Sequence, residues 1–226
     1  MAAHAGTGHL ETSTGLDNKK LLMWLFLGSD CLFFGSFIAA FLLYRDRSLE
    51  VCRDLLALDP TNTASCVFAS DTTINVSGQT FMFEGLWDIP FTSVSAFVLL
   101  MSSVSMVLAL AAIQRGNIRN MQVWLLTTAL LGTLFVAGQA YEFTEFYHAG
   151  LHLDTNLTGT TFFVLTGFHG AHVTIGILIL MSIFVYSLRG GIQQKHSLNI
   201  ELAGLYWHFV DIVWIVIFTL IYLIQP

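Results

Sequence analysis

The chain has 226 residues, of which 55% are hydrophobic and only 11% are charged, with a mean hydropathy of +0.70 and a formal net charge of −6. A soluble domain carries roughly 25% charged residues, so this composition excludes a soluble domain and indicates a multi-pass membrane protein. The acidic balance also argues against a nucleic-acid partner, which would require a basic patch.

Five apolar segments each have the length, about 20 residues, that a helix needs to cross a hydrocarbon core of about 30 Å. A polar tail, residues 1–18, precedes them, and one sizeable polar loop, residues 45–87, separates the first two. We therefore predict an all-α fold, a bundle of five transmembrane helices within residues 19–226. The predicted spans are residues 21–43, 91–113, 121–141, 162–188 and 202–224.

The basic residues predict how the bundle is oriented. Five spans place the two termini on opposite sides of the membrane, and six of the nine basic residues fall on the side of the N-terminus. The positive-inside rule then puts the N-terminus in the cytoplasm and the C-terminus outside. The six are Lys19, Lys20, Arg115, Arg119, Arg189 and Lys195, whereas Arg45, Arg47 and Arg53 lie in the loop predicted to be outside.

The first span contains a carboxyl group close to the middle of the membrane. Asp30 is the tenth residue of the predicted span, about 14 Å in at 1.5 Å per residue, and Ser29 precedes it. Desolvation at this depth favours the neutral form of the carboxyl group, which suits reversible proton binding. A permanently protonated Asp30 that only bonds a neighbouring helix fits the spacing equally well. We interpret the adjacent Cys31 as a small apolar residue.

The loop of residues 45–87 contains two cysteines, Cys52 and Cys66. On the outer side of a membrane they could form a disulfide, which would stabilise the loop by about 3 kcal/mol by a chain-entropy estimate. The alternative is two free thiols. The loop is also acidic, with Asp46, Glu50, Asp54, Asp59, Asp71 and Glu84.

The third and fourth spans carry polar residues at helical spacing. Gln139, Glu142 and Glu145 are three apart and therefore share one helix face, and His169 and His172 are also three apart. A contact between Glu142 and one of the histidines is expected across the two helices. The glycines expected to allow these helices to approach closely are Gly167, Gly170 and Gly176.

The fifth span contains a second polar pair, His208 and Asp211, next to Trp207 and Trp214. Three interpretations of the polar residues are open: interhelix hydrogen bonds, a metal site of His and Glu side chains, and haem ligated by two histidines. Histidines three apart point about 60° apart around a helix axis, which is not ideal for binding one metal ion. Hydrogen bonding is the favoured interpretation.

Four stretches, in this order along the chain, resemble subunit III of the haem–copper oxidases, the cytochrome c oxidase and quinol oxidase complexes. The similarity extends from about Asn18 to the C-terminus. The stretches are Trp24-Leu25-Phe26-Leu27-Gly28-Ser29-Asp30-Cys31-Leu32-Phe33-Phe34, Gln139-Ala140-Tyr141-Glu142-Phe143, Thr166-Gly167-Phe168-His169-Gly170-Ala171-His172-Val173 and Tyr206-Trp207-His208-Phe209-Val210-Asp211-Ile212-Val213-Trp214.

The chain departs from many members of that family in two respects. It lacks their first two helices, as the shorter bacterial forms do, so one wall of the family's lipid-filled cleft is missing. It also carries Asp30 where many members carry Glu. Aspartate at this position resembles the quinol-oxidising branch, so the resemblance leaves cytochrome c and quinol both open as electron donor, with cytochrome c the first choice.

The resemblance implies an accessory subunit of a proton-pumping terminal oxidase in a bacterial cytoplasmic membrane. Haem and copper would belong to the partner subunits I and II, with no cofactor on this chain except structural phospholipids. Asp30, next to Ser29, would support proton uptake. A scaffold that joins the oxidase to a larger respiratory complex and a haem-binding membrane cytochrome are the alternatives. Interhelix or lipid contacts would be made by Gln139, Glu142, His169, His172, Trp207, His208 and Asp211.

Overall fold

The computed structural model describes residues 17–63, 66–68 and 71–224. Five of its helices are long and apolar enough to cross a membrane, which confirms the predicted fold class. The elements are α1 (Asn18–Leu58), β1 (Thr72–Val76), β2 (Gln79–Phe83), α2 (Ile89–Gln114), α3 (Ile118–His148), α4 (Leu157–Leu188), the 3₁₀ turn η1 (Gln194–His196), α5 (Ser197–Phe218) and the π-helical turn η2 (Thr219–Leu223).

Side-chain caps fix where several helices begin. Asp88 accepts a hydrogen bond from the backbone N–H of Phe91 at 3.1 Å, and Asn156 accepts one from Gly159 at 2.6 Å. Each such cap satisfies a backbone donor that the first turn of a helix leaves free. After α2 and α4, Gly116 and Gly190 adopt positive φ values of 75° and 73°, which glycine tolerates without strain.

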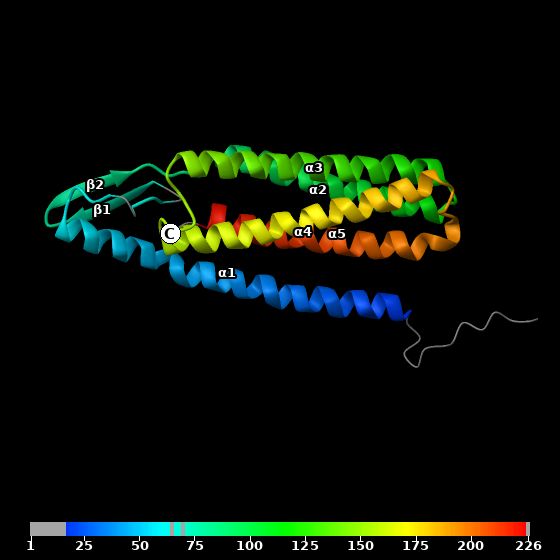
Figure 1. The fold of residues 1–226 in the computed structure, drawn as a ribbon, viewed down its shortest axis with the longest axis horizontal. Helices are drawn as coiled ribbons and strands as arrows, with labels where there is room; N and C mark the ends of the chain where they lie inside the picture. The colour runs from blue at the N-terminus through cyan, green and yellow to red at the C-terminus, as the bar shows by residue number, and fades with distance from the viewer. Residues whose placement is uncertain (1–16, 64–65, 69–70, 225–226) are drawn as a thin grey trace, which may run out of the picture.

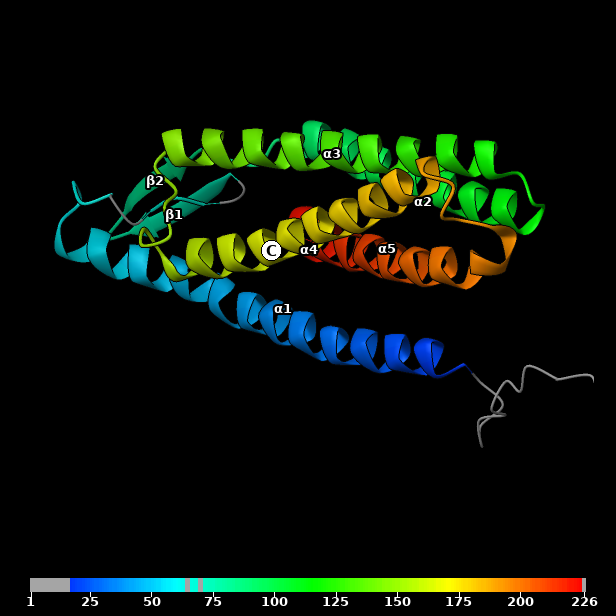
Figure 2. The same cartoon turned by 45° about the vertical axis from the view of Figure 1, so that its right-hand side comes forward.

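Helices α2, α3, α4 and α5 form a closed ring in which each packs against two others of the four, and α1 lies outside the ring against α4 and α5 (Figures 1 and 2). The N-terminal end of α1 and the turn η2 lie at opposite ends of the helical bundle. We call the end with the α2–α3 and α4–α5 connections the inner end and the other the outer end, as the predicted orientation would have them.

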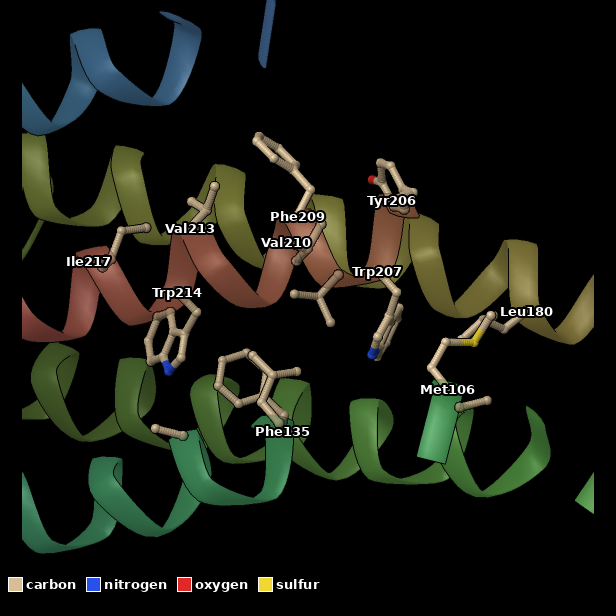
Figure 3. Close-up of a cluster of buried hydrophobic side chains, with 14 of the residues drawn as sticks. Met106, Phe135, Leu180, Tyr206, Trp207, Phe209, Val210, Val213, Trp214 and Ile217 are labelled. Carbon is tan, nitrogen blue, oxygen red and sulfur yellow. The ribbon is translucent and has the colours of Figure 1, made fainter. Parts of the chain in front are cut away.

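The core of the ring is built around Trp207 of α5, which Figure 3 shows among Met106, Leu180 and Phe135. A Cβ atom on Gly132 of α3 would come within 2.5 Å of the Trp207 ring, and one on Gly176 of α4 within 2.9 Å. Only glycine therefore leaves room for the indole. The prediction that Gly176 allows close approach is confirmed. It is wrong for Gly167, where a Cβ would meet nothing within 4 Å.

The first four predicted spans lie inside the observed helices, and the fifth extends one residue beyond η2. α1 runs on 15 residues beyond its predicted end, from residue 43 to Leu58. The fifth span is divided between α5 and η2. Asn18, predicted as part of the tail, is the first residue of α1, and residues 1–16 lie outside the described part of the chain.

The extension of α1 belongs to a small outer subdomain, residues 45–87, that the sequence analysis treated only as a loop. β1 and β2 form an antiparallel hairpin in which Ser77 and Gly78 both have positive φ, 53° and 84°, as a tight two-residue hairpin turn requires. Cys52 and Cys66 are joined by a disulfide with their Cα atoms 5.3 Å apart. The subdomain has its own core of Cys52, Leu56, Cys66, Phe68, Ile74 and Val76.

Candidate functional site

Asp30 faces the fourth helix. Its Oδ2 atom lies 3.9 Å from Nε2 of His172 on α4. His172 donates from Nδ1 to the carbonyl of Phe168 at 2.8 Å, so Nε2 is the ring nitrogen that faces the carboxyl group. The side chains of both are largely buried, with 14% and 17% of their surface exposed. Sequence reasoning found both residues but did not predict that they pair. Ser29 takes no part and bonds its own helix at the carbonyl of Phe26.

A groove of about 350 Å³ runs from the inner end of the bundle towards this pair. Met23 and Phe26 of α1 line one wall and Ile179 and Ile183 of α4 another, residues of α5 complete the lining, and His172 lies at its deep end. Eleven residues of α4 separate Ile183 from His172, which is about 16 Å at 1.5 Å per residue. The groove thus has the depth of about half a hydrocarbon core.

Polar contacts attach α1 to the ring at the inner end, beyond the groove, and at the outer end, beyond the Asp30–His172 pair. At the inner end Lys20 forms an ion pair with Glu201 of α5 at 2.5 Å. At the outer end the hydroxyls of Ser48 and Thr158 are 2.6 Å apart. The attachment is therefore made at the inner end, at mid-depth and at the outer end, with the apolar groove between the first two.

Glu142 does not contact a histidine, so that prediction is wrong. Its Oε1 atom accepts hydrogen bonds from the hydroxyls of Thr92 on α2, at 2.5 Å, and Tyr222 in η2, at 3.3 Å. Gln139, one turn earlier on α3, instead faces α4 and donates to the carbonyl of Thr166 at 3.5 Å. Gln139 and Glu142, predicted to share one helix face, thus contact different neighbours. Glu145, predicted on the same face, is exposed, as is His148 three residues further along.

His169 is completely buried in the middle of the bundle. Its Nε2 atom lies 3.2 Å from the carbonyl of Val210 on α5, and its ring stacks on Trp214 with centroids 4.9 Å apart. His169 therefore makes an interhelix contact through Nε2, between α4 and α5.

His208 and Asp211 both face α2. Nδ1 of His208 lies 2.6 Å from the hydroxyl of Ser103, whereas the carboxyl oxygens of the buried Asp211 have no hydrogen-bond partner among the described residues. Trp207 donates to the hydroxyl of Ser102 at 2.9 Å. These two α2 serines were not among the predicted site residues, although three serines within residues 102–105, in the middle of the span, were a visible signal.

Within the described residues, no group of three or more His, Cys, Asp or Glu side chains could hold a metal ion. The polar residues of the bundle interior instead bond one another in separate pairs and small clusters. Cys31 is a free thiol on the exposed side of α1.

Comparison with known proteins decides the family. The family model for cytochrome c oxidase subunit III matches residues 80–225. The chain belongs to this family. Cytochrome c oxidase subunit 3 of Bacillus sp. strain PS3 is 31% identical over 206 residues, covering 91% of this chain and 86% of the relative. Quinol oxidase subunit 3 of Bacillus spizizenii is 32% identical over 200 residues, covering 88% and 84%.

A third relative is similar over nearly its whole length. Cytochrome c oxidase subunit 3 of Alkalihalophilus pseudofirmus is 31% identical over 232 aligned residues, which cover 96% of this chain and 97% of the relative. This protein is therefore a multi-pass membrane protein, subunit III of a haem–copper oxidase, and associates with other subunits of that oxidase. The resemblance inferred from four sequence stretches is confirmed.

Proposed function

We propose that this subunit is a redox-inactive accessory part of the oxidase in a bacterial cytoplasmic membrane. It braces subunits I and II, which would hold the haem and copper, and its Asp30–His172 pair supports proton uptake by subunit I. The observation that carries the second role is the distance of 3.9 Å between a carboxyl oxygen and an imidazole nitrogen at mid-depth. Such a pair exchanges one proton between two groups without leaving a lone charge in the membrane.

A phospholipid of the inner leaflet fits the groove beside this pair. The groove is lined mainly by apolar side chains, it is about half a membrane deep, and Lys20 and Lys19 lie near its inner end. Met23, Phe26, Ile179 and Ile183 would hold an acyl chain, while the lysines attract the anionic head group. A lipid there would separate His172 from water at the inner surface.

The experiment that tests the proton role replaces Asp30 by Asn in the assembled oxidase. We expect the D30N complex to retain its subunits and haem spectrum but to lose activity faster during turnover and to show a shifted pH dependence. C31S is the matched control, because Cys31 is adjacent but lies on the exposed face of α1. If D30N matches the wild type in both respects, Asp30 serves packing only.

The same purified complex is used to test the electron donor and the location of the haem. Both kinds of electron donor are represented among the relatives' names, and we propose cytochrome c as the donor, to be compared with quinol in oxidation assays. Haem should leave with the partner subunits when the complex is separated. Haem that stays on the isolated chain would make it a membrane cytochrome.

The outer subdomain supports the scaffold role as a second candidate. Its exposed helical extension carries Glu50 and Asp54, whose charge would attract a basic soluble partner. Reversing both charges in the E50K/D54K variant should weaken donor or partner binding at low salt without removing haem. Binding that is unchanged and equally salt-dependent would exclude this role.

A further inference from the structure

The inner half of the ring contains a polar seam between α2 and α5 that is separate from the Asp30–His172 pair. Ser102 and Ser103 of α2 face Trp207, His208 and Asp211 of α5. Polar side chains at membrane depth are costly and therefore tend to have a function or a partner. The hydrogen bond from the Trp207 indole to Ser102 is explained by helix packing alone. Packing does not explain Ser103, His208 and Asp211.

Burial increases along these three residues. Ser103 and His208 are half-buried, whereas Asp211 is 3% exposed. Neither oxygen of the Asp211 carboxyl group has a partner at hydrogen-bond geometry within the described structure, although the Ser103 hydroxyl lies close enough to interact with it. A charged carboxylate without hydrogen bonds in an apolar interior is strongly disfavoured, and the neutral acid is disfavoured far less.

Ser103 is placed to connect the other two. A serine hydroxyl can accept one hydrogen bond while it donates another, and the Ser103 oxygen is 2.6 Å from Nδ1 of His208. The arrangement is not that of a hydrolytic triad, in which the carboxylate orients the histidine. Here the serine lies between the histidine and the carboxyl group, an order that suits proton transfer.

We propose that Ser103, His208 and Asp211 form a proton-binding site in the bundle, with His208 as its entrance and Asp211 as its store. In the transfer step the Nδ1–H bond of protonated His208 breaks and its proton forms a new O–H bond on Ser103. The original hydroxyl proton of Ser103 passes to a carboxylate oxygen of Asp211. The products are a neutral imidazole, a neutral carboxylic acid and an intact serine hydroxyl, so protons and charge balance.

The polar and charged groups of the neighbouring helices have other partners than this site. From α4, His169 bonds the carbonyl of Val210, and α3 contributes Phe135, which packs on His169 and Trp214. The charged groups of α1 and the inner end act on other parts of α5, since Lys20 pairs with Glu201 and Asp30 interacts with Tyr206. The site is independent of the role proposed for Asp30.

Infrared spectroscopy of the assembled oxidase, carboxyl-labelled with ¹³C in aspartate, tests the proposal. We expect a carbonyl band of a protonated, isotope-shifted aspartic acid that is lost in D211N and retained in D30N. Transfer into D₂O should shift the band through exchange of its proton. S103A should slow this exchange by about 100-fold, the lower end of what a positioned proton-transfer group contributes.

S102A is the matched control, because it removes the neighbouring bond to Trp207 and leaves the proposed path intact. It should exchange at the wild-type rate. If D211N does not assemble, the hydrogen–deuterium exchange rates of S103A and H208Q, compared with the wild type, still test the proposal. A band that survives in D211N, a band that never shifts in D₂O, or equal rates in S103A, H208Q and the wild type would each overturn the proposal.

Discussion

The ring of α2–α5 and helix α1 are similarly apolar but are held in different ways. In the most apolar 18-residue window of α5, 50% of the residues are buried, against 11% in α1. The ring is held by an interlocked aromatic core around Trp207 and by polar contacts between its own helices. α1 packs against α4 and α5 of the ring and, through its outer extension, against the hairpin, and much of its surface faces outward.

The ring is therefore stabilised by its own contacts, whereas the position of α1 depends on its surroundings. The ring has the buried core that a stable membrane bundle needs. α1, in contrast, exposes Leu22, Leu25 and Leu32, so lipids or a neighbouring subunit must cover it. The Asp30–His172 pair and the groove lie at the boundary between the two regions. Their geometry therefore depends on how α1 is held.

The largest effect is expected at the outer end of α1. Replacing both cysteines, in C52S/C66S, removes a cross-link between residues 14 apart, which should destabilise the outer subdomain by about 3 kcal/mol. The ring should be unaffected, because the subdomain has a separate core. Limited proteolysis within residues 59–78 should accelerate in this variant.

The C31S variant is the control for this comparison, since Cys31 is a free thiol. Its proteolysis should match the wild type. If C52S/C66S also lowers the melting temperature of the whole complex, the outer subdomain and the ring are one cooperative unit, and the division drawn above is wrong.

A smaller effect, but one in the ring itself, is expected for G132A. The new Cβ atom would lie 2.5 Å from the Trp207 ring, and overpacking of this kind typically costs about 1–3 kcal/mol. We expect thermal denaturation of the complex at lower temperature. G167A is the matched control, because a Cβ there meets nothing within 4 Å. It should be neutral or stabilising, since alanine favours a helix interior over glycine by about 0.5–1 kcal/mol.

The sequence predicted the spans because membrane depth requires long apolar segments, and it found most polar positions because few occur at that depth. It could not predict the partners of those positions. Gln139 and Glu142 share a face by spacing, yet small rotations decide that one meets α4 and the other meets Thr92 of α2. The serines of α2 and Tyr222 became part of the sites only through helix packing.

The outer hairpin was missed for a different reason. Burial alternates along β1, but the two strands are only five residues long, and in β2 the apolar Met82, between Phe81 and Phe83, is 81% exposed. The two residues with positive φ, Ser77 and Gly78, were a visible turn signal. The 15 residues by which α1 exceeds its predicted span are polar enough to resemble a loop, and they are helical because Leu49, Cys52 and Leu56 pack on one face against the hairpin.

The smallest effect is expected at the inner attachment of α1. Lys20 and Glu201 form an ion pair at 2.5 Å, but their side chains are 31% and 32% exposed, and pairs exposed to solvent contribute only about 0.2–1 kcal/mol. K20E should therefore change global stability little. Because this contact attaches the inner end of α1 to α5, we expect K20E instead to increase the motion of α1, measured as the distance distribution between spin labels on α1 and α5.

The charge-reversed double variant K20E/E201K distinguishes the ion pair from the loss of a lysine near the lipid head groups. If the pair positions α1, the double variant should restore the narrow distance distribution of the wild type. If the distribution stays broad, the lysine acts through the membrane surface. In that case the inner half of α1 is held by lipid, and the groove next to Asp30 is shaped by the occupant rather than by the protein.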